Sequence, residues 1–101
     1  MIKSYRDLIV WQKGMQLVME VYFLTKKFPQ SELYGLANQM KRAAVSIPSN
    51  IAEGFARKHR QEYTQFLRVA YASAAELDTQ IEISERLKFV SGKDVNKASV
   101  W

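Results

Sequence analysis

The sequence LYGLANQMKRAAVSIPSNIAEGFAR occupies residues 33–57, and its apolar side chains recur at intervals of three and four positions. This spacing predicts an α-helix with one buried face, because residues three and four apart lie on the same side of a helix. The predicted buried face consists of Leu33, Leu36, Met40, Ala43 or Ala44, Ile47, Ile51 and Phe55. The predicted polar face consists of Asn38, Gln39, Arg42, Ser46, Ser49, Asn50, Glu53 and Arg57. Other helices must cover the apolar face.

Two residue types fix the bounds and the shape of this helix. Ser31 follows Pro29 and is a good N-cap, so the helix is expected over about 32–57. Pro48 has no N–H to donate to the carbonyl of Ala44, and its ring crowds that carbonyl. A kink is therefore predicted at Pro48.

The preceding segment predicts a first helix over about 5–28, with a capping box at Ser4 and Asp7 and a stop at Pro29. One apolar stripe of this helix is Leu8, Trp11, Met15, Val18, Tyr22 and Thr25. The other is Val10, Leu17, Val21, Leu24 and Phe28. Two stripes are too much apolar surface for one seam. Either the helix lies deep in a bundle, or the stripe from Val10 to Leu24 forms an interface between subunits.

A third helix is expected over about 61–89 and a fourth over 93–101. The small side chains of residues 70–75 would let a neighbouring helix approach closely. Ser91 and Gly92 are expected to end the third helix. No alternating strand pattern is present, so the chain is expected to be an all-α single domain over 1–101.

The composition argues against most catalytic sites. The chain has no cysteine and a single histidine, His59, which stands among basic residues. Asp78, Glu82 and Glu85 share one helix face but have no histidine nearby in sequence, which favours a solvated acidic surface over a metal site. No phosphate-binding glycine loop is present. We expect no enzymatic activity, no cofactor and no metal.

Basic residues exceed acidic ones by fifteen to ten, which gives a net charge of +5. The first 60 residues carry ten basic and four acidic side chains, so an anionic partner would meet that half. The candidate phosphate-binding residues are Lys41, Arg42, Arg57, Lys58, Arg60 and Arg68. The alternative is that Arg57 only closes an i, i+4 ion pair with Glu53 and the other charges keep the surface soluble.

No stretch of the sequence has the length or hydropathy of a membrane span, and polar residues interrupt the apolar stretch at residues 8–11. Together with the absence of cysteine, this predicts a cytoplasmic protein that does not bind membranes.

The order-specific run SIPSNIAEG at residues 46–54, preceded by Arg42, resembles the family of four-helix bundle proteins named after intervening sequences in bacterial 23S rRNA genes. Further stretches agree with that family at residues 5–13, 24–29 and 32–36, and at residues 74–77. The residues that match its motif are Arg42, Ser46, Pro48, Ser49, Asn50, Glu53 and Gly54. The polar members suit hydrogen bonding between helices, the lining of a channel, or contact with RNA.

The resemblance implies an antiparallel up-down four-helix bundle that assembles as a homo-oligomer, a pentamer in known examples. The fourth helix is short or truncated in this chain, because only nine residues follow Gly92. Similar proteins are accessory factors of diversity-generating retroelements, where they bind nucleic acid and a reverse transcriptase. The resulting hypothesis is a homo-oligomer that binds nucleic acid, RNA rather than DNA, through backbone electrostatics. The alternative is a scaffold or accessory subunit that contacts only proteins.

Overall fold

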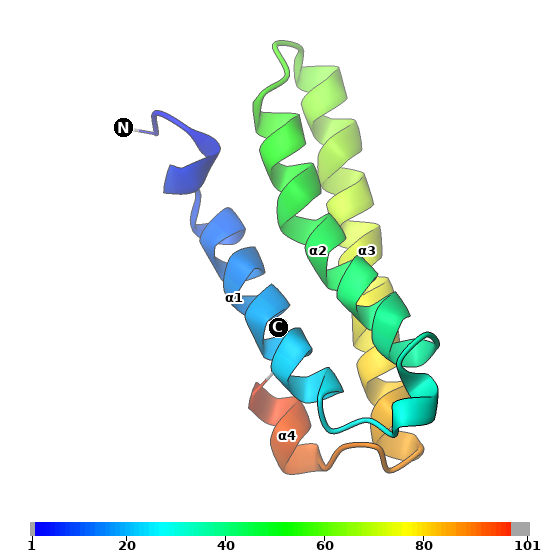
Figure 1. Ribbon diagram of the computed structural model, residues 1–101. Coiled ribbons are helices and arrows are strands. Elements are labelled where there is room, and N and C mark those ends of the chain that lie inside the picture. Colours follow the sequence, from blue (N-terminus) through cyan, green and yellow to red (C-terminus); the bar gives the residue numbers. More distant parts are fainter. Residues whose placement is uncertain (1, 98–101) are drawn as a thin grey trace.

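The computed structural model describes residues 2–97, and every regular element in that part of the chain is helical (Figure 1). The long helices are α1 (Ile9–Thr25), α2 (Leu36–Phe55) and α3 (Arg60–Arg86). The short ones are the 3₁₀ turns η1 (Tyr5–Asp7) and η2 (Gln30–Glu32) and the final helix α4 (Gly92–Lys97). The predicted all-α bundle with a short fourth helix is confirmed.

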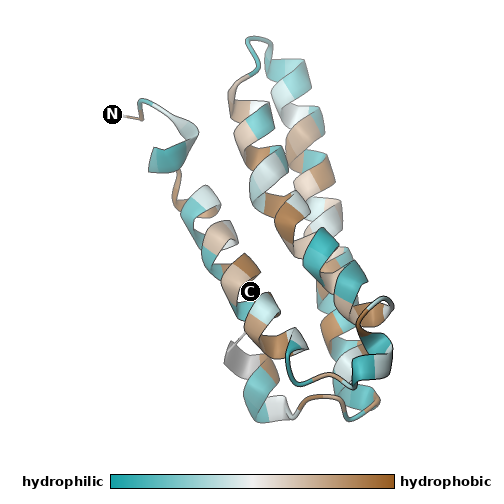
Figure 2. Cartoon of the chain, viewed as in Figure 1, coloured by the Kyte–Doolittle hydropathy of each residue, from teal (hydrophilic) through white to brown (hydrophobic). Residues whose placement is uncertain are grey.

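The helices alternate in direction, and α2 packs against both α1 and α3 (Figure 1). The short helix α4 contacts α1 and α3, so it occupies the fourth position of the bundle at the end where α3 finishes. The molecule is elongated, with extents of 44 × 22 × 19 Å. In Figure 2 apolar residues are spread along the three long helices, whereas the loop between α2 and α3 is hydrophilic.

The core corrects one expectation about α1. One of the two alternatives placed Leu17, Val21 and Leu24 at a subunit interface, but they are at most 6% exposed and pack inside their own chain. Val10 is the one member of that predicted interface that is exposed. The stripe faces α2 and the rest of the core, so another subunit cannot reach its buried members. The core comprises Leu17, Val21, Leu24, Phe28, Ala37, Met40, Ala43, Ala44, Ile47, Ile51, Ala70, Ala74, Leu77, Ile81 and Val90.

The first helix is shorter than predicted at both ends. Ser4 and Asp7 do form a capping box, but it caps η1, and the extended backbone of Leu8 separates this turn from α1. At the other end, Lys27 and Phe28 donate their backbone N–H groups to carbonyls three residues back. This 3₁₀ spacing ends the α-helix at Thr25, ahead of Pro29.

The predicted N-cap of the second helix is wrong. Ser31 lies within η2, and the N-cap of α2 is Gly35. The Glu32 carboxylate accepts a hydrogen bond of 3.2 Å from the backbone N–H of Leu36, so an acidic side chain from the preceding turn satisfies a donor of the first turn. Sequence spacing could not reveal this, because the contact depends on how the chain turns between Glu32 and Leu36.

The third helix ends earlier than predicted, and Ser91 has a different role. Lys88 adopts a left-handed conformation with φ 63, and the N–H groups of Lys88 and Phe89 donate to the carbonyls of Glu85 and Ser84. These two bonds are a Schellman motif that closes α3. Ser91 instead forms a reciprocal capping box with Asp94 at the start of α4.

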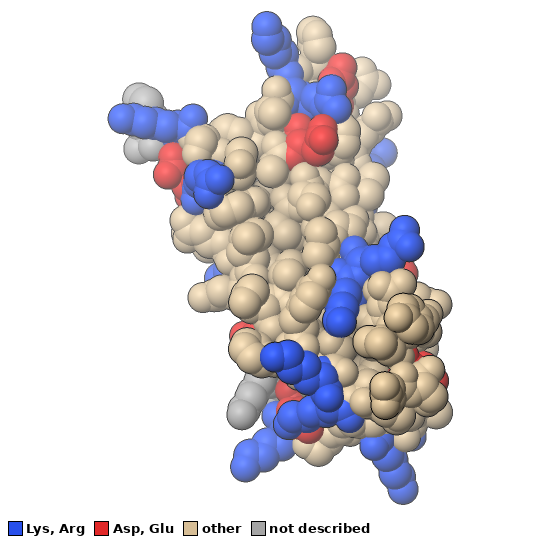
Figure 3. All heavy atoms as spheres, viewed as in Figure 1, with Lys and Arg blue, Asp and Glu red and all other residues tan. Residues whose placement is uncertain are grey.

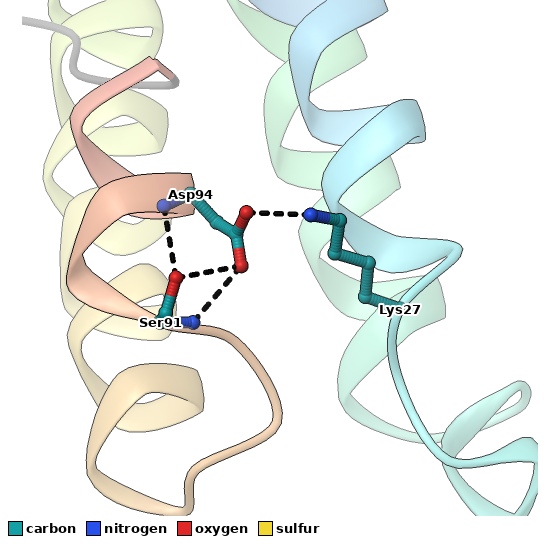
Figure 4. Close-up of polar contacts among 3 residues, drawn as sticks. All are labelled: Lys27, Ser91 and Asp94. Atoms are coloured by element: carbon teal, nitrogen blue, oxygen red, sulfur yellow. Dashed lines mark hydrogen bonds and ion pairs between the residues drawn. The ribbon is translucent and has the colours of Figure 1, made fainter.

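The same aspartate anchors α4 to α1. Its carboxylate accepts hydrogen bonds from Lys27 at 2.5 Å and from the backbone and hydroxyl of Ser91 (Figure 4). The Lys27 and Ser91 donors hold the pKa of Asp94 well below its usual range, so the ion pair persists throughout the neutral pH range. The last part of the predicted fourth helix, residues 98–101, lies outside the described residues.

Two glycines let α2 approach its neighbours closely. A Cβ atom on Gly14 of α1 would lie 3.3 Å from the Cβ of Pro48, which is buried inside an uninterrupted α2. A Cβ atom on Gly54 would lie only 2.9 Å from the Cβ of Phe66 on α3. Pro48 therefore serves as a packing surface for α1, and the kink at this residue stays a prediction.

We expect Gly54→Ala to destabilise the bundle, because the new methyl group must push α2 and α3 apart. Overpacking of this kind costs about 1–3 kcal/mol. Gly14→Ala is the matched variant. Both variants gain about 1 kcal/mol in helix propensity, but only at Gly14 is the contact loose enough for this gain to offset the crowding, so the free energy of unfolding of Gly14→Ala should stay near that of the wild type. Urea unfolding followed by circular dichroism measures both, and equal effects of the two variants would contradict this account.

Candidate nucleic-acid interface

Ser46 of the SIPSNIAEG run links α2 to α3. The Ser46 hydroxyl lies 2.8 Å from the hydroxyl of Ser73 on α3, and the Asn50 amide donates to the carbonyl and hydroxyl oxygens of Ser46 at 2.7 and 2.9 Å. These groups are buried or half-buried, so the bonds offset the cost of removing them from water. Of the three roles that the sequence left open, Ser46 adopts hydrogen bonding between helices, and Asn50 supports it from within α2.

The other members of the motif divide between packing and surface. Pro48 and Gly54 form the close contacts with α1 and α3 described above. Glu53 accepts a hydrogen bond of 3.0 Å from Arg57, as the i, i+4 spacing predicted. Ser49 and Arg42 are exposed. Most of the motif thus holds the bundle together, and Arg42 is the member that is free to meet an anionic partner.

The turn between α2 and α3 brings Arg57, Lys58 and Arg60 together. All three are exposed, but the Arg57 guanidinium is held by Glu53 and lies 4.9 Å from the centroid of the Phe66 ring. Within the described residues no carboxylate lies within 4.0 Å of Lys58 or Arg60. We define the hairpin patch as Arg57, Lys58 and Arg60. It therefore offers two cations without an ion-pair partner and a third, Arg57, that is paired with Glu53.

Lys41 and Arg42 form a second basic region far from the hairpin patch. They lie thirteen or more residues before Phe55 at the end of α2, which is about 20 Å along the helix axis. The Lys41 ammonium lies 5.0 Å from the centroid of the Tyr22 ring on α1. Figure 3 shows basic side chains both over α2 and at the two ends of the molecule. The six predicted phosphate-binding residues therefore do not form one continuous patch.

Arg68 is exposed on α3, beyond the hairpin patch, and no carboxylate of the described residues lies within 4.0 Å of it. His59 is exposed and precedes α3 without a side-chain cap bond. In residues 2–97 no three His, Asp or Glu side chains are grouped so that they could hold a metal ion. None of the described helices is both long and apolar enough to cross a membrane.

Sequence reasoning missed two side chains that the structure makes important. Ser73 was noticed only as one of the small residues in 70–75, and its hydroxyl proves to be the partner of Ser46. Tyr22 was assigned to an apolar stripe, yet the residue is 42% exposed and its ring contacts the Lys41 ammonium. Spacing along one helix gave no signal for either, because both contacts lie between helices.

Loss of the Ser46 hydroxyl should weaken the bundle, since Ser46→Ala leaves the buried hydroxyl of Ser73 without its partner and removes one of the two bonds of the Asn50 amide. We expect a loss of about 1–2 kcal/mol in the free energy of unfolding. Ser49→Ala, in the same motif but on the exposed side, is the control and should change stability by less than about 0.5 kcal/mol. Denaturant unfolding measures both, and a neutral Ser46→Ala would show that the network contributes nothing.

Comparison with known proteins identifies the family of this chain. No curated protein matches the chain. A family model described as 23S rRNA-intervening sequence protein matches residues 6–100, nearly the whole sequence. The match spans all three long helices and includes the SIPSNIAEG run within α2. The chain therefore belongs to the 23S rRNA-intervening sequence protein family.

Proposed function

We propose that this chain is a non-enzymatic, homo-oligomeric, cytoplasmic protein that binds nucleic acid through the phosphate backbone. The observation that carries the proposal is the set of exposed or half-buried cations on α2, at the hairpin patch and on α3 that have no carboxylate within 4.0 Å in the described part of the chain. They are Lys41, Arg42, Lys58, Arg60 and Arg68.

Phosphate contacts of this kind position a protein on nucleic acid without selecting a sequence. The ion pairs of the described residues neutralise Lys27, Arg57 and Arg86, so the excess of +5 is carried largely by other side chains. The family name refers to ribosomal RNA. For this reason we propose RNA rather than DNA as the partner.

The homo-oligomer is supported by the outer α1 face, which we define as Met15, Met19 and Phe23. These residues follow one another at intervals of four and are 43%, 58% and 62% exposed, so they form an apolar line on the side of α1. Exposed apolar surface of this kind marks interaction sites. We therefore place the subunit contact on the outer α1 face and not on the buried stripe. The number of subunits that we propose is five, as in the known examples that the chain resembles.

The same outer α1 face also supports a second candidate function. An apolar surface serves equally well to dock a different protein, and the positive charge then only keeps the assembly soluble. In that case the chain is a scaffold or accessory subunit, for example of a reverse transcriptase, and has no direct contact with nucleic acid.

Binding of a fluorescent single-stranded RNA at several salt concentrations tests the nucleic-acid proposal. The logarithm of the binding constant should fall linearly with the logarithm of salt, by about 0.7 for each phosphate neutralised. The triple variant Arg57→Gln, Lys58→Gln, Arg60→Gln should lower this slope by up to about 2. Arg86→Gln, a cation paired with Glu82 at the far end of α3, is the control and should leave the slope unchanged. Absence of binding at low salt would favour the scaffold.

Charges on the outer α1 face should separate the subunits. The double variant Met19→Glu, Phe23→Glu places two carboxylates on the proposed contact, and their desolvation opposes association. We expect a smaller mass by light scattering with unchanged helicity, because neither residue is buried in the chain. An unchanged mass would remove this face as the contact between subunits.

A further inference from the structure

An open hollow of about 350 Å³ lies between α1 and α2. Its walls combine two cations, an aromatic ring, an amide, a hydroxyl and one apolar side chain. The lining residues are Tyr22, Asn38, Lys41, Arg42, Val45 and Ser46. Its volume is at the small end of the range of about 300–1,000 Å³ that is typical of ligand sites. The hollow can therefore hold a group of limited size.

The charge of the hollow is uncompensated. Lys41 and Arg42 have no carboxylate of the described residues within 4.0 Å. The nearest acidic residue after them on α2 is Glu53, about 16 Å further along the helix axis, and it is already paired with Arg57. An arginine presents a planar fork of donors that matches a phosphate, and a lysine adds a mobile point charge. The hollow therefore favours an anion with phosphate geometry.

The ring and the amide favour more than a bare phosphate. Tyr22 is 42% exposed and has the Lys41 ammonium over its ring, 5.0 Å from the centroid, and Val45, which is 41% exposed, adds an apolar wall. Aromatic rings of this exposure are platforms on which nucleobases stack. The Asn38 side chain can both donate and accept hydrogen bonds, as the edge of a base requires. Cations, a ring and an amide in one small hollow match the parts of a nucleotide.

We propose that this hollow binds one unpaired nucleotide of a single-stranded RNA. The base stacks on Tyr22 and bonds to Asn38, and the adjoining phosphate binds Lys41 and Arg42. This inference rests on the proposed binding of RNA and names its site. A paired base is stacked inside its helix and cannot reach the ring, so single strands and loops are preferred over duplexes.

The test measures the affinity of the whole chain for a labelled ten-nucleotide oligouridine and for an RNA duplex of equal length. Tyr22→Leu removes the stacking platform but keeps an apolar side chain. Loss of stacking on one base should weaken binding of the single strand by about 5- to 100-fold. Arg42→Gln should lower the salt slope by about 0.7 through loss of one phosphate contact. Neither change should weaken binding of the duplex to the same extent.

The chain offers a matched control for each change. Tyr34 is 90% exposed and Lys26 is an exposed cation at the end of α1, but neither residue lines the hollow. Tyr34→Leu and Lys26→Gln should therefore leave the affinity for oligouridine within about twofold of the wild type. Circular dichroism and light scattering on every variant verify that fold and mass are retained.

The outcomes separate the two proposals. If the wild type binds oligouridine and the hollow variants bind as tightly as the control variants, the nucleotide site lies elsewhere. That result overturns the proposed site in the hollow but leaves the proposal of RNA binding intact. If the wild type binds neither RNA, both proposals fail. Arg42 is exposed, so the effect of Arg42→Gln on the single strand compared with the duplex decides the question even if Tyr22→Leu disturbs packing. If a hollow variant binds the single strand and the duplex more weakly by the same factor, the proposed site in the hollow is also overturned, because the change then indicates a general effect of charge.

Discussion

The close packing of α2 against both of its neighbours is the constraint on which the rest of the structure depends. Gly14 admits Pro48 on the side of α1, and Gly54 admits Phe66 on the side of α3. A proline inside a helix normally costs a backbone hydrogen bond. Here the ring of Pro48 is buried against Gly14, which has no side chain. A residue that is unfavourable within α2 therefore contributes to the packing of α2 on α1.

Polar bonding adds specificity to that packing. The hydroxyls of Ser46 and Ser73 meet between α2 and α3, and Asn50 braces Ser46 from one turn further on. A hydrogen bond of this kind is worth only about 1 kcal/mol, but a slip of one helix along the other would leave buried hydroxyls without partners. The network therefore fixes the register of α2 on α3, while the apolar core supplies the bulk of the stability.

The same packing decides which surfaces are free for partners. Because α2 uses one side for α1 and another for α3, its remaining surface beside α1 carries Lys41 and Arg42. The hairpin patch lies at the other end of α2, where Glu53 already holds one of its cations. Two separate basic regions suit an extended anionic partner that spans both, as a single-stranded nucleic acid does.

The sequence by itself determined the helical class, the three long helices and the family. The spacing of apolar residues and the SIPSNIAEG run are local patterns, so they can be recognised without knowing how the helices pack. It also predicted the Ser4–Asp7 box and the Glu53–Arg57 pair, whose partners lie within one turn. Only the tertiary structure decided which stripe of α1 is core. It also decided that Ser91 caps α4 and that Tyr22 meets Lys41. The burial of a stripe and a contact between helices depend on how helices rotate against each other, and periodicity within one helix does not specify that rotation.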